Sequence, residues 1–111
     1  MSYTIAQNQS GALPLTFPFN SPITGDVTIA LAGTCWSNAA QALGGVVVML
    51  DNVQIGQVEL FFNDAGLHIT LPTQFFPVEL DTGGPHKITL LPLTGNTVSD
   101  QNDFFSLWIL D

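Results

Sequence analysis

Basic residues are almost absent from this chain of 111 residues, which contains one lysine, Lys87, and no arginine. Its nine acidic residues give it a net charge of −8 at pH 7. Because proteins hold phosphate groups through several lysine and arginine side chains, this composition argues against nucleic-acid binding. It argues against attraction to an anionic membrane surface for the same reason.

Cysteine is also nearly absent, since Cys35 is the only one in the chain. One cysteine forms neither an intrachain disulfide nor a thiolate metal cluster within one chain. No apolar run approaches the roughly 18 residues of a transmembrane helix. Residues 1–9 contain neither a basic region nor an apolar run, as a signal peptide would. We therefore expect cytoplasmic synthesis without a cleaved signal peptide, with later release or attachment at a cell surface left open.

Apolar residues are plentiful enough for one hydrophobic core. They make up 46% of the chain, the mean hydropathy is +0.36, and charged residues make up only 9%. This balance excludes disorder. The length suits one domain, because two cores would each have too few residues, so we expect residues 1–111 to form a single domain.

Short apolar segments alternate with the period of two that is typical of β-strands. Turn residues separate them at 51–52, 63–66 and 81–85, and Pro14, Pro18 and Pro22 suit edge segments. The predicted strands include residues 26–31, 46–50, 53–61, 67–71, 76–80, 86–91 and 104–110. About eight strands at this spacing predict an all-β fold, an antiparallel β-sandwich or barrel. Residues 33–45 are expected to form a long loop, with a helical turn over 37–43 as the alternative.

Two of these strands are apolar on both faces, namely residues 46–50 and 104–110. A two-layer sandwich covers only the inner face of each sheet, so the outer face of such a strand needs another cover. A second copy of the chain is the simplest cover, and loops of the same chain are the alternative. The sequence therefore predicts a homo-oligomer.

The C-terminal third, mainly residues 76–111, resembles the end of tumour-necrosis-factor-like (TNF-like) jelly rolls, a shape shared with the heads of complement-type proteins. The resemblance rests on the run VELDTGGPHKITL at 78–90 and the ending DFFSLWILD at 103–111. It implies a jelly-roll sandwich that assembles as a trimer. One branch of this family consists of small bacterial lectins that bind fucosylated sugars. Their sugar contacts involve arginine, which this chain lacks, so only the scaffold carries over.

Neutral sugars are bound by an aromatic face together with a few amide or carboxylate groups. Trp36 and Asn38 lie among small polar residues, and Asn63 and Asp64 occupy a predicted turn. These four residues, together with His68, are the candidate ligand-binding residues. The alternatives are that Trp36 folds back over the core and that His68 is an exposed histidine without a function.

Calcium is a weaker alternative to a protein without cofactors. The segment 100–103 places Asp100, Asn102 and Asp103 in one predicted loop, and calcium prefers carboxylate and amide oxygens. A bound divalent cation would also relieve repulsion at a net charge of −8. The competing interpretation is a solvated loop whose aspartate caps the last strand.

Catalysis has little support in the sequence. The Gly-x-Ser-x-Gly motif is absent, and the acidic residues are scattered, mostly at turns. Cys35 could meet His68 or His86, but packing in the core is the simpler role for this cysteine. We expect His86 to bond to the backbone of the preceding turn.

The sequence thus predicts a non-enzymatic, lectin-like protein that binds a neutral glycan as a small homo-oligomer, with a trimer as the first choice. The alternative is a structural module, such as a trimeric domain associated with a phage, a secretion machine or a capsid.

Overall fold

A computed structural model describes residues 2–80 and 83–111 as strands, turns and connecting segments. The described residues contain no helix, and so none that could cross a membrane. The chain extends 42 × 22 × 21 Å. Its strands are β1 (Ser2–Ser10), β2 (Leu15–Ser21), β3 (Gly25–Ser37), β4 (Ala42–Leu50), β5 (Val53–Phe62), β6 (Ile69–Thr70), β7 (Gln74–Leu80), β8 (Gly84–Pro92), β9 (Thr97–Val98) and β10 (Phe104–Leu110).

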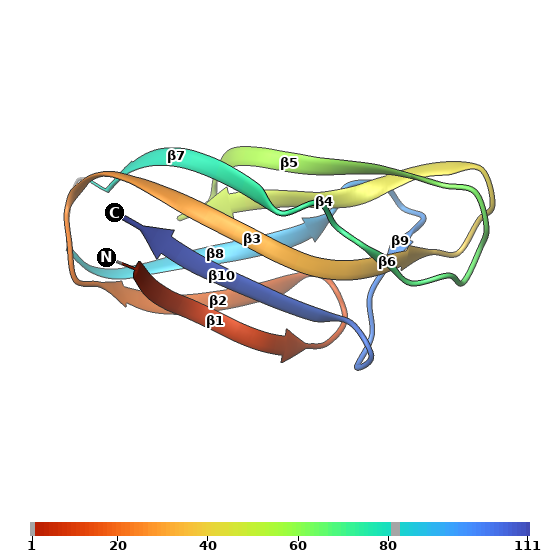
Figure 1. The fold of residues 1–111 in the computed structure, drawn as a ribbon, viewed down its shortest axis with the longest axis horizontal. Coiled ribbons are helices and arrows are strands. Elements are labelled where there is room, and N and C mark those ends of the chain that lie inside the picture. Colours follow the sequence, from red (N-terminus) through yellow and green to blue (C-terminus); the bar gives the residue numbers. More distant parts are fainter. Residues whose placement is uncertain (1, 81–82) are drawn as a thin grey trace.

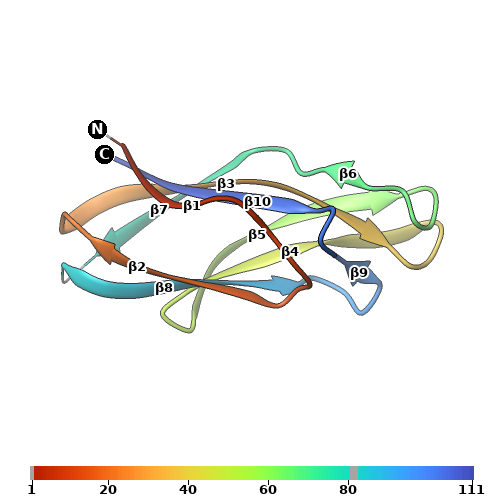
Figure 2. The same ribbon diagram turned by 90° about the horizontal axis from the view of Figure 1, so that it is seen from below.

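Two antiparallel sheets face one another (Figures 1 and 2). Sheet I has the order β1-β10-β3-β7, and the short strands β6 and β9 extend it by pairing with the far end of β3. Sheet II has the order β2-β8-β4-β5. The chain passes repeatedly from one sheet to the other, which is the connectivity of a jelly roll. The predicted all-β antiparallel sandwich is therefore confirmed.

The core lies between the sheets and follows the predicted alternation. On β3 the inward residues Val27, Ile29 and Leu31 are at most 5% exposed. Burial of such side chains contributes about 25 cal/mol for each Å² of apolar surface removed from water. Opposing strands complete the core with Val46, Val48, Ile88, Leu90, Phe105, Leu107 and Ile109, all at most 1% exposed.

The outer face of sheet I is apolar as well. Ala30 points outward yet is only 2% exposed, because Trp108 and Phe75 stand opposite it on the two neighbouring strands. Phe75 itself is 58% exposed, and Phe104 on the same face is 48% exposed. We call Phe75, Phe104 and Trp108 the aromatic face. The loops that the structure describes do not bury Phe75 and Phe104.

The predicted long loop over 33–45 is wrong, and so is the helical turn over 37–43. β3 continues to Ser37 and β4 begins at Ala42, so only residues 38–41 form the turn. The glycines of this segment lie inside strands. Gly33 lies against the Phe105 ring and Gly44 against the Phe62 ring, where any side chain would clash. Glycine is needed inside these strands to admit the aromatic rings.

The other predicted turns and strand boundaries agree in part with the structure. The Asp51-Asn52 hairpin is present, and both residues have positive φ angles, 49° and 70°. Pro18 lies in β2 at the edge of sheet II, as expected. The strand predicted over 67–71 is reduced to Ile69–Thr70, and residues 81–82 of one predicted turn lie outside the described residues.

Gly45 provides a test of the strand assignment. Its φ is +133°, and a Cβ atom there would strike the carbonyl oxygen of Val58 on β5. We expect Gly45→Ala to lower the free energy of unfolding by about 2 kcal/mol or more. Gly95→Ala is the matched control, because no described atom lies within 4 Å of its Cβ position. Urea unfolding of both variants checks this, and equal losses would contradict the assignment.

Candidate functional site

One end of the sandwich is built from the β3–β4 turn and the loop between β5 and β6, at the right of Figure 1. Backbone bonds hold these segments together. The N–H of Gly66 donates to the carbonyl of Ser37 at 2.8 Å, and the N–H of Gln41 donates to the carbonyl of Asn63 at 3.3 Å. The end is therefore a fixed surface made of two chain segments.

All five predicted ligand-binding residues lie at this end. Trp36 is half-buried, whereas Asn38, Asn63, Asp64 and His68 are exposed. The rings of Trp36 and His68 are in contact, with centroids 5.9 Å apart and planes tilted by 40°. We call these five residues the Trp36 end. Trp36 does not fold entirely over the core, because part of its surface remains accessible.

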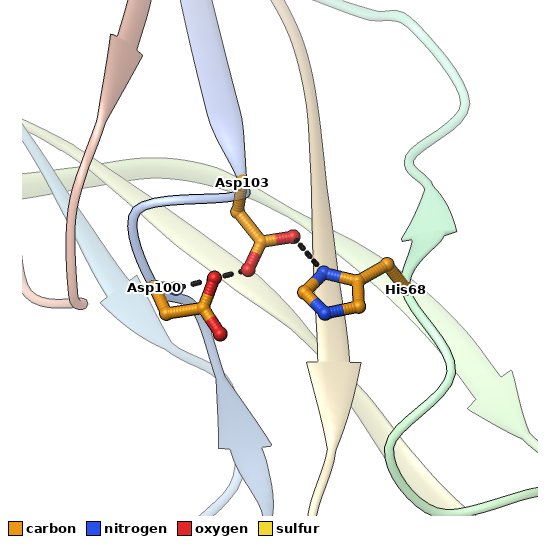
Figure 3. Close-up of side chains that lie close together, drawn as sticks. All are labelled: His68, Asp100 and Asp103. Carbon is orange, nitrogen blue, oxygen red and sulfur yellow. Dashed lines mark hydrogen bonds and ion pairs between the residues drawn. The ribbon is translucent and has the colours of Figure 1, made fainter.

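A buried carboxylate supports this end from below. Asp103 stands just before β10 and is fully buried, with 0% exposure. Its Oδ1 accepts a hydrogen bond from Thr34 Oγ1 at 2.8 Å. It also accepts one from His68 Nδ1 at 2.7 Å, which Figure 3 shows. Its Oδ2 accepts a bond from the Asp100 N–H at 2.9 Å. A buried carboxylate is tolerated only when it is bonded in this way.

The bond to Asp103 determines the chemistry of His68. It raises the pKa of His68 above its ordinary 6.5, and the charge of Asp100 adds to the effect. Since Nδ1–H donates to the carboxylate, Nε2 of the neutral ring is left as a hydrogen-bond acceptor. The imidazole is 38% exposed, so a ligand can reach it.

Cys35 is buried beneath the same network. Burial, and secondarily the carboxylate of Asp103, raises the pKa of the thiol to about 12. The thiol is therefore protonated at neutral pH and is not an activated nucleophile. Its position in the core agrees with the predicted packing role.

The predicted calcium ligands are only partly brought together. Asn102 is exposed, and its N–H donates to Asp100 Oδ1 at 2.8 Å. His68 instead joins Asp100 and Asp103 in a group whose ligand atoms lie within 4.8 Å of one another. Both oxygens of Asp103 already accept hydrogen bonds, and calcium takes six to eight oxygens. The group supplies one imidazole nitrogen and two carboxylates, which is fewer ligands than calcium requires.

His86 has partners that the sequence does not predict. Its Nδ1 contacts the carboxylate of Asp51 in the β4–β5 turn, and its ring stacks on Phe19. The other oxygen of Asp51 accepts from the N–H of Lys87 at 2.9 Å. This pair fastens the hairpin to β8 and is separate from the Trp36 end.

Asp103→Asn tests the His68 network. The neutral amide removes the charge, so we expect the pKa of His68 to fall toward 6.5 or below. Because folding raises this pKa, protonated His68 stabilises the native state below pH 6.5, and the contribution disappears as pH rises through the folded-state pKa. NMR titration of the imidazole protons measures the shift. Asp64→Asn should leave it unchanged, and an unchanged pKa in Asp103→Asn would contradict the account.

The sequence matches no protein-family model and no curated protein. Solved structures do share its fold. The dimeric latent PorU of Porphyromonas gingivalis aligns with a TM-score of 0.56 at 9% identity, over 100% of this chain and 12% of PorU. This chain thus spans a small part of PorU. The C-terminal domain of EclA, a sugar-binding protein, aligns at TM-score 0.52 and 16% identity, covering 98% and 76% of the two chains.

A third similar structure is a family 35 carbohydrate-binding module from Clostridium thermocellum. It has a TM-score of 0.52 and 10% identity, and the alignment covers 98% of this chain and 89% of the module. At these identities the likeness concerns the fold. The jelly roll is thus shared with compact domains of similar length, some of which bind sugars.

Proposed function

We propose that this protein is a non-enzymatic carbohydrate-binding module that takes a neutral glycan at the Trp36 end. The observation that carries the proposal is the contact between the Trp36 and His68 rings at an end of the sandwich where Asn38, Asn63 and Asp64 are also exposed. Trp36 and His68 offer ring surface for the C–H face of a sugar. The amides and the carboxylate offer donors and acceptors for its hydroxyl groups.

Asp103 acts as a positioning residue in this proposal. It holds the His68 ring through Nδ1, so that Nε2 accepts a hydrogen bond from a sugar hydroxyl. The indole N–H of Trp36 is shielded and has no partner among the described residues, so the exposed part of the ring would make the contact with the sugar. A neutral sugar suits this end because the only basic residue, Lys87, lies on β8 of sheet II.

Two structural neighbours support the same class of function. One is described as a sugar-binding protein and the other as a carbohydrate-binding module. The network also favours binding over catalysis, because the Thr34 hydroxyl donates to Asp103 rather than to His68. The proposal includes no cofactor, and the glycan-binding test below is run with and without calcium.

A homo-oligomer, with a trimer first, is part of the proposal. The exposed aromatic face supports it, since large apolar patches on a small domain tend to be covered by a partner. Joining several Trp36 ends would raise avidity by about 100-fold or more without any new contact to the sugar. The alternative function, a structural assembly module, also rests on the aromatic face and requires no sugar site.

A glycan array probed with the intact protein separates the two functions. We expect selective binding to neutral glycans, and parallel arrays with calcium and with chelator determine whether a metal contributes. No binding under either condition, at concentrations that preserve the oligomer, would reject the carbohydrate proposal and favour the assembly module.

Trp36→Ala tests the position of the site. We expect the monovalent affinity for the best array ligand, measured by calorimetry, to fall about tenfold or more, because a stacked ring contributes roughly 1–3 kcal/mol. Phe75→Ala removes an exposed aromatic on β7, away from the Trp36 end, and should leave the affinity unchanged. Equal losses in both variants would place the sugar elsewhere.

Phe104→Glu tests the oligomer. Phe104 is 48% exposed, so a charge there is tolerated by the single chain but disfavours a covered aromatic face. We expect sedimentation to change from trimer to monomer while the monovalent affinity is kept. A wild-type protein that sediments as a monomer would overturn this part of the proposal.

A further inference from the structure

The end of sheet I opposite the Trp36 end is hollowed. A groove of about 580 Å³ lies where β3 begins, β7 ends and β10 ends, near the chain terminus marked C in Figure 1. We call it the β7 groove. Its apolar floor and acidic rim are formed by Thr28, Pro77, Leu110, Asp26, Glu79 and Asp111.

The acidic rim contains two like charges in direct opposition. Asp26 on β3 pairs with Glu79 on β7, and both side chains are exposed. Side chains at directly opposed positions have Cβ atoms about 5 Å apart, and like charges there destabilise a sheet. Asp111 also lines the groove. Sheet I has no lysine or arginine to offset Asp26 and Glu79, since Lys87 belongs to sheet II.

The rim does not have the spacing of a metal site. Within residues 2–80 and 83–111, the group with closely spaced ligand atoms is His68, Asp100 and Asp103, at the other end of the molecule. Carboxylates spread around an apolar floor instead fit an organic cation on an apolar stem. Lysine and arginine side chains have this form, because their stems pack on apolar surface while their heads reach the charge.

A second hollow of about 470 Å³ lies on the other side of β7. It shares Pro77, Val78 and Glu79 with the β7 groove and is lined further by Leu50, Val53 and Ile55 of sheet II. Small-molecule sites usually enclose most of their ligand. These two hollows instead flank one edge strand and lie open along it, so they suit a chain segment that passes around β7.

We propose that the β7 groove docks a basic segment of another protein, with lysine or arginine over Asp26 and Glu79 and an apolar side chain on Leu110 and Pro77. A second copy of this chain does not fit, because it carries one basic residue against nine acidic ones. The inference is independent of sugar binding and uses the opposite end of the molecule, so both partners can be held together.

The test is an NMR titration of the isotope-labelled full chain with a six-residue peptide alternating lysine and leucine. We expect amide shifts confined to the β7 groove and no binding of the matched glutamate–leucine peptide. Glu79→Gln should weaken binding about two- to fivefold, as for one partly exposed ion pair, and Asp26→Asn with Glu79→Gln roughly tenfold. Asp64→Asn removes the same charge at the Trp36 end and should change the affinity less than about twofold.

Three results would overturn the proposal: no binding of the lysine–leucine peptide, shifts spread over all acidic residues, or an equal effect of Asp64→Asn and Glu79→Gln. The last two would mean attraction by net charge alone. A folding control is included, since removing one of two opposed charges should raise the midpoint of thermal unfolding. A lower midpoint in Glu79→Gln would contradict the repulsion on which the inference rests.

Discussion

The buried carboxylate of Asp103 organises one end of this molecule. It receives hydrogen bonds from a strand of sheet I through Thr34, from the loop before β6 through His68, and from the segment before β10 through the Asp100 N–H. Removing such a group from water costs several kcal/mol, at least about 2 for an unpaired polar group, unless its bonds are complete. The three segments therefore hold one arrangement, and with it the orientation of the exposed His68 ring.

The two ends of the sandwich differ in chemistry. At the Trp36 end, an aromatic ring contacts an exposed imidazole that is bonded to a buried carboxylate. At the other end, opposed carboxylates surround an apolar floor. Between them the aromatic face of sheet I is exposed. One small domain thus presents three surfaces, each suited to a partner of different chemistry, on a single jelly-roll core.

The fold was predictable because alternating burial is a local signal. Val27, Ile29 and Leu31 have the period of two in the sequence and are buried in the structure. The ends of β3 and β4 were not predictable, since a glycine that admits the Phe105 or Phe62 ring cannot be told from a turn glycine without knowing which strand faces it. The local alternation of apolar residues thus predicts where strands lie. The residues at which a strand begins and ends depend on the side chains of the neighbouring strands.

The residues of the site, like the strands, could be predicted from the sequence only in part. Trp36 and His68 could be selected from residue type and setting, and the structure brings their rings into contact. The pairing of His68 with Asp103 was missed, because the two residues are 35 positions apart and meet only through the register of β3 with β10 and β6. The sequence offers Asp103 only as a weak calcium candidate or as the cap of the last strand in a solvated loop, since it contains no sign that this residue is fully buried.

An NMR titration of the labelled protein with a neutral oligosaccharide selected on the glycan array tests the central claim most directly. The indole N–H signals of Trp36 and Trp108 report separately on the Trp36 end and on the aromatic face. The account predicts that the Trp36 signal and the imidazole signals of His68 shift with saturable, stoichiometric binding, while the Trp108 signal stays in place. A shift of Trp108 with an unchanged Trp36 would contradict it.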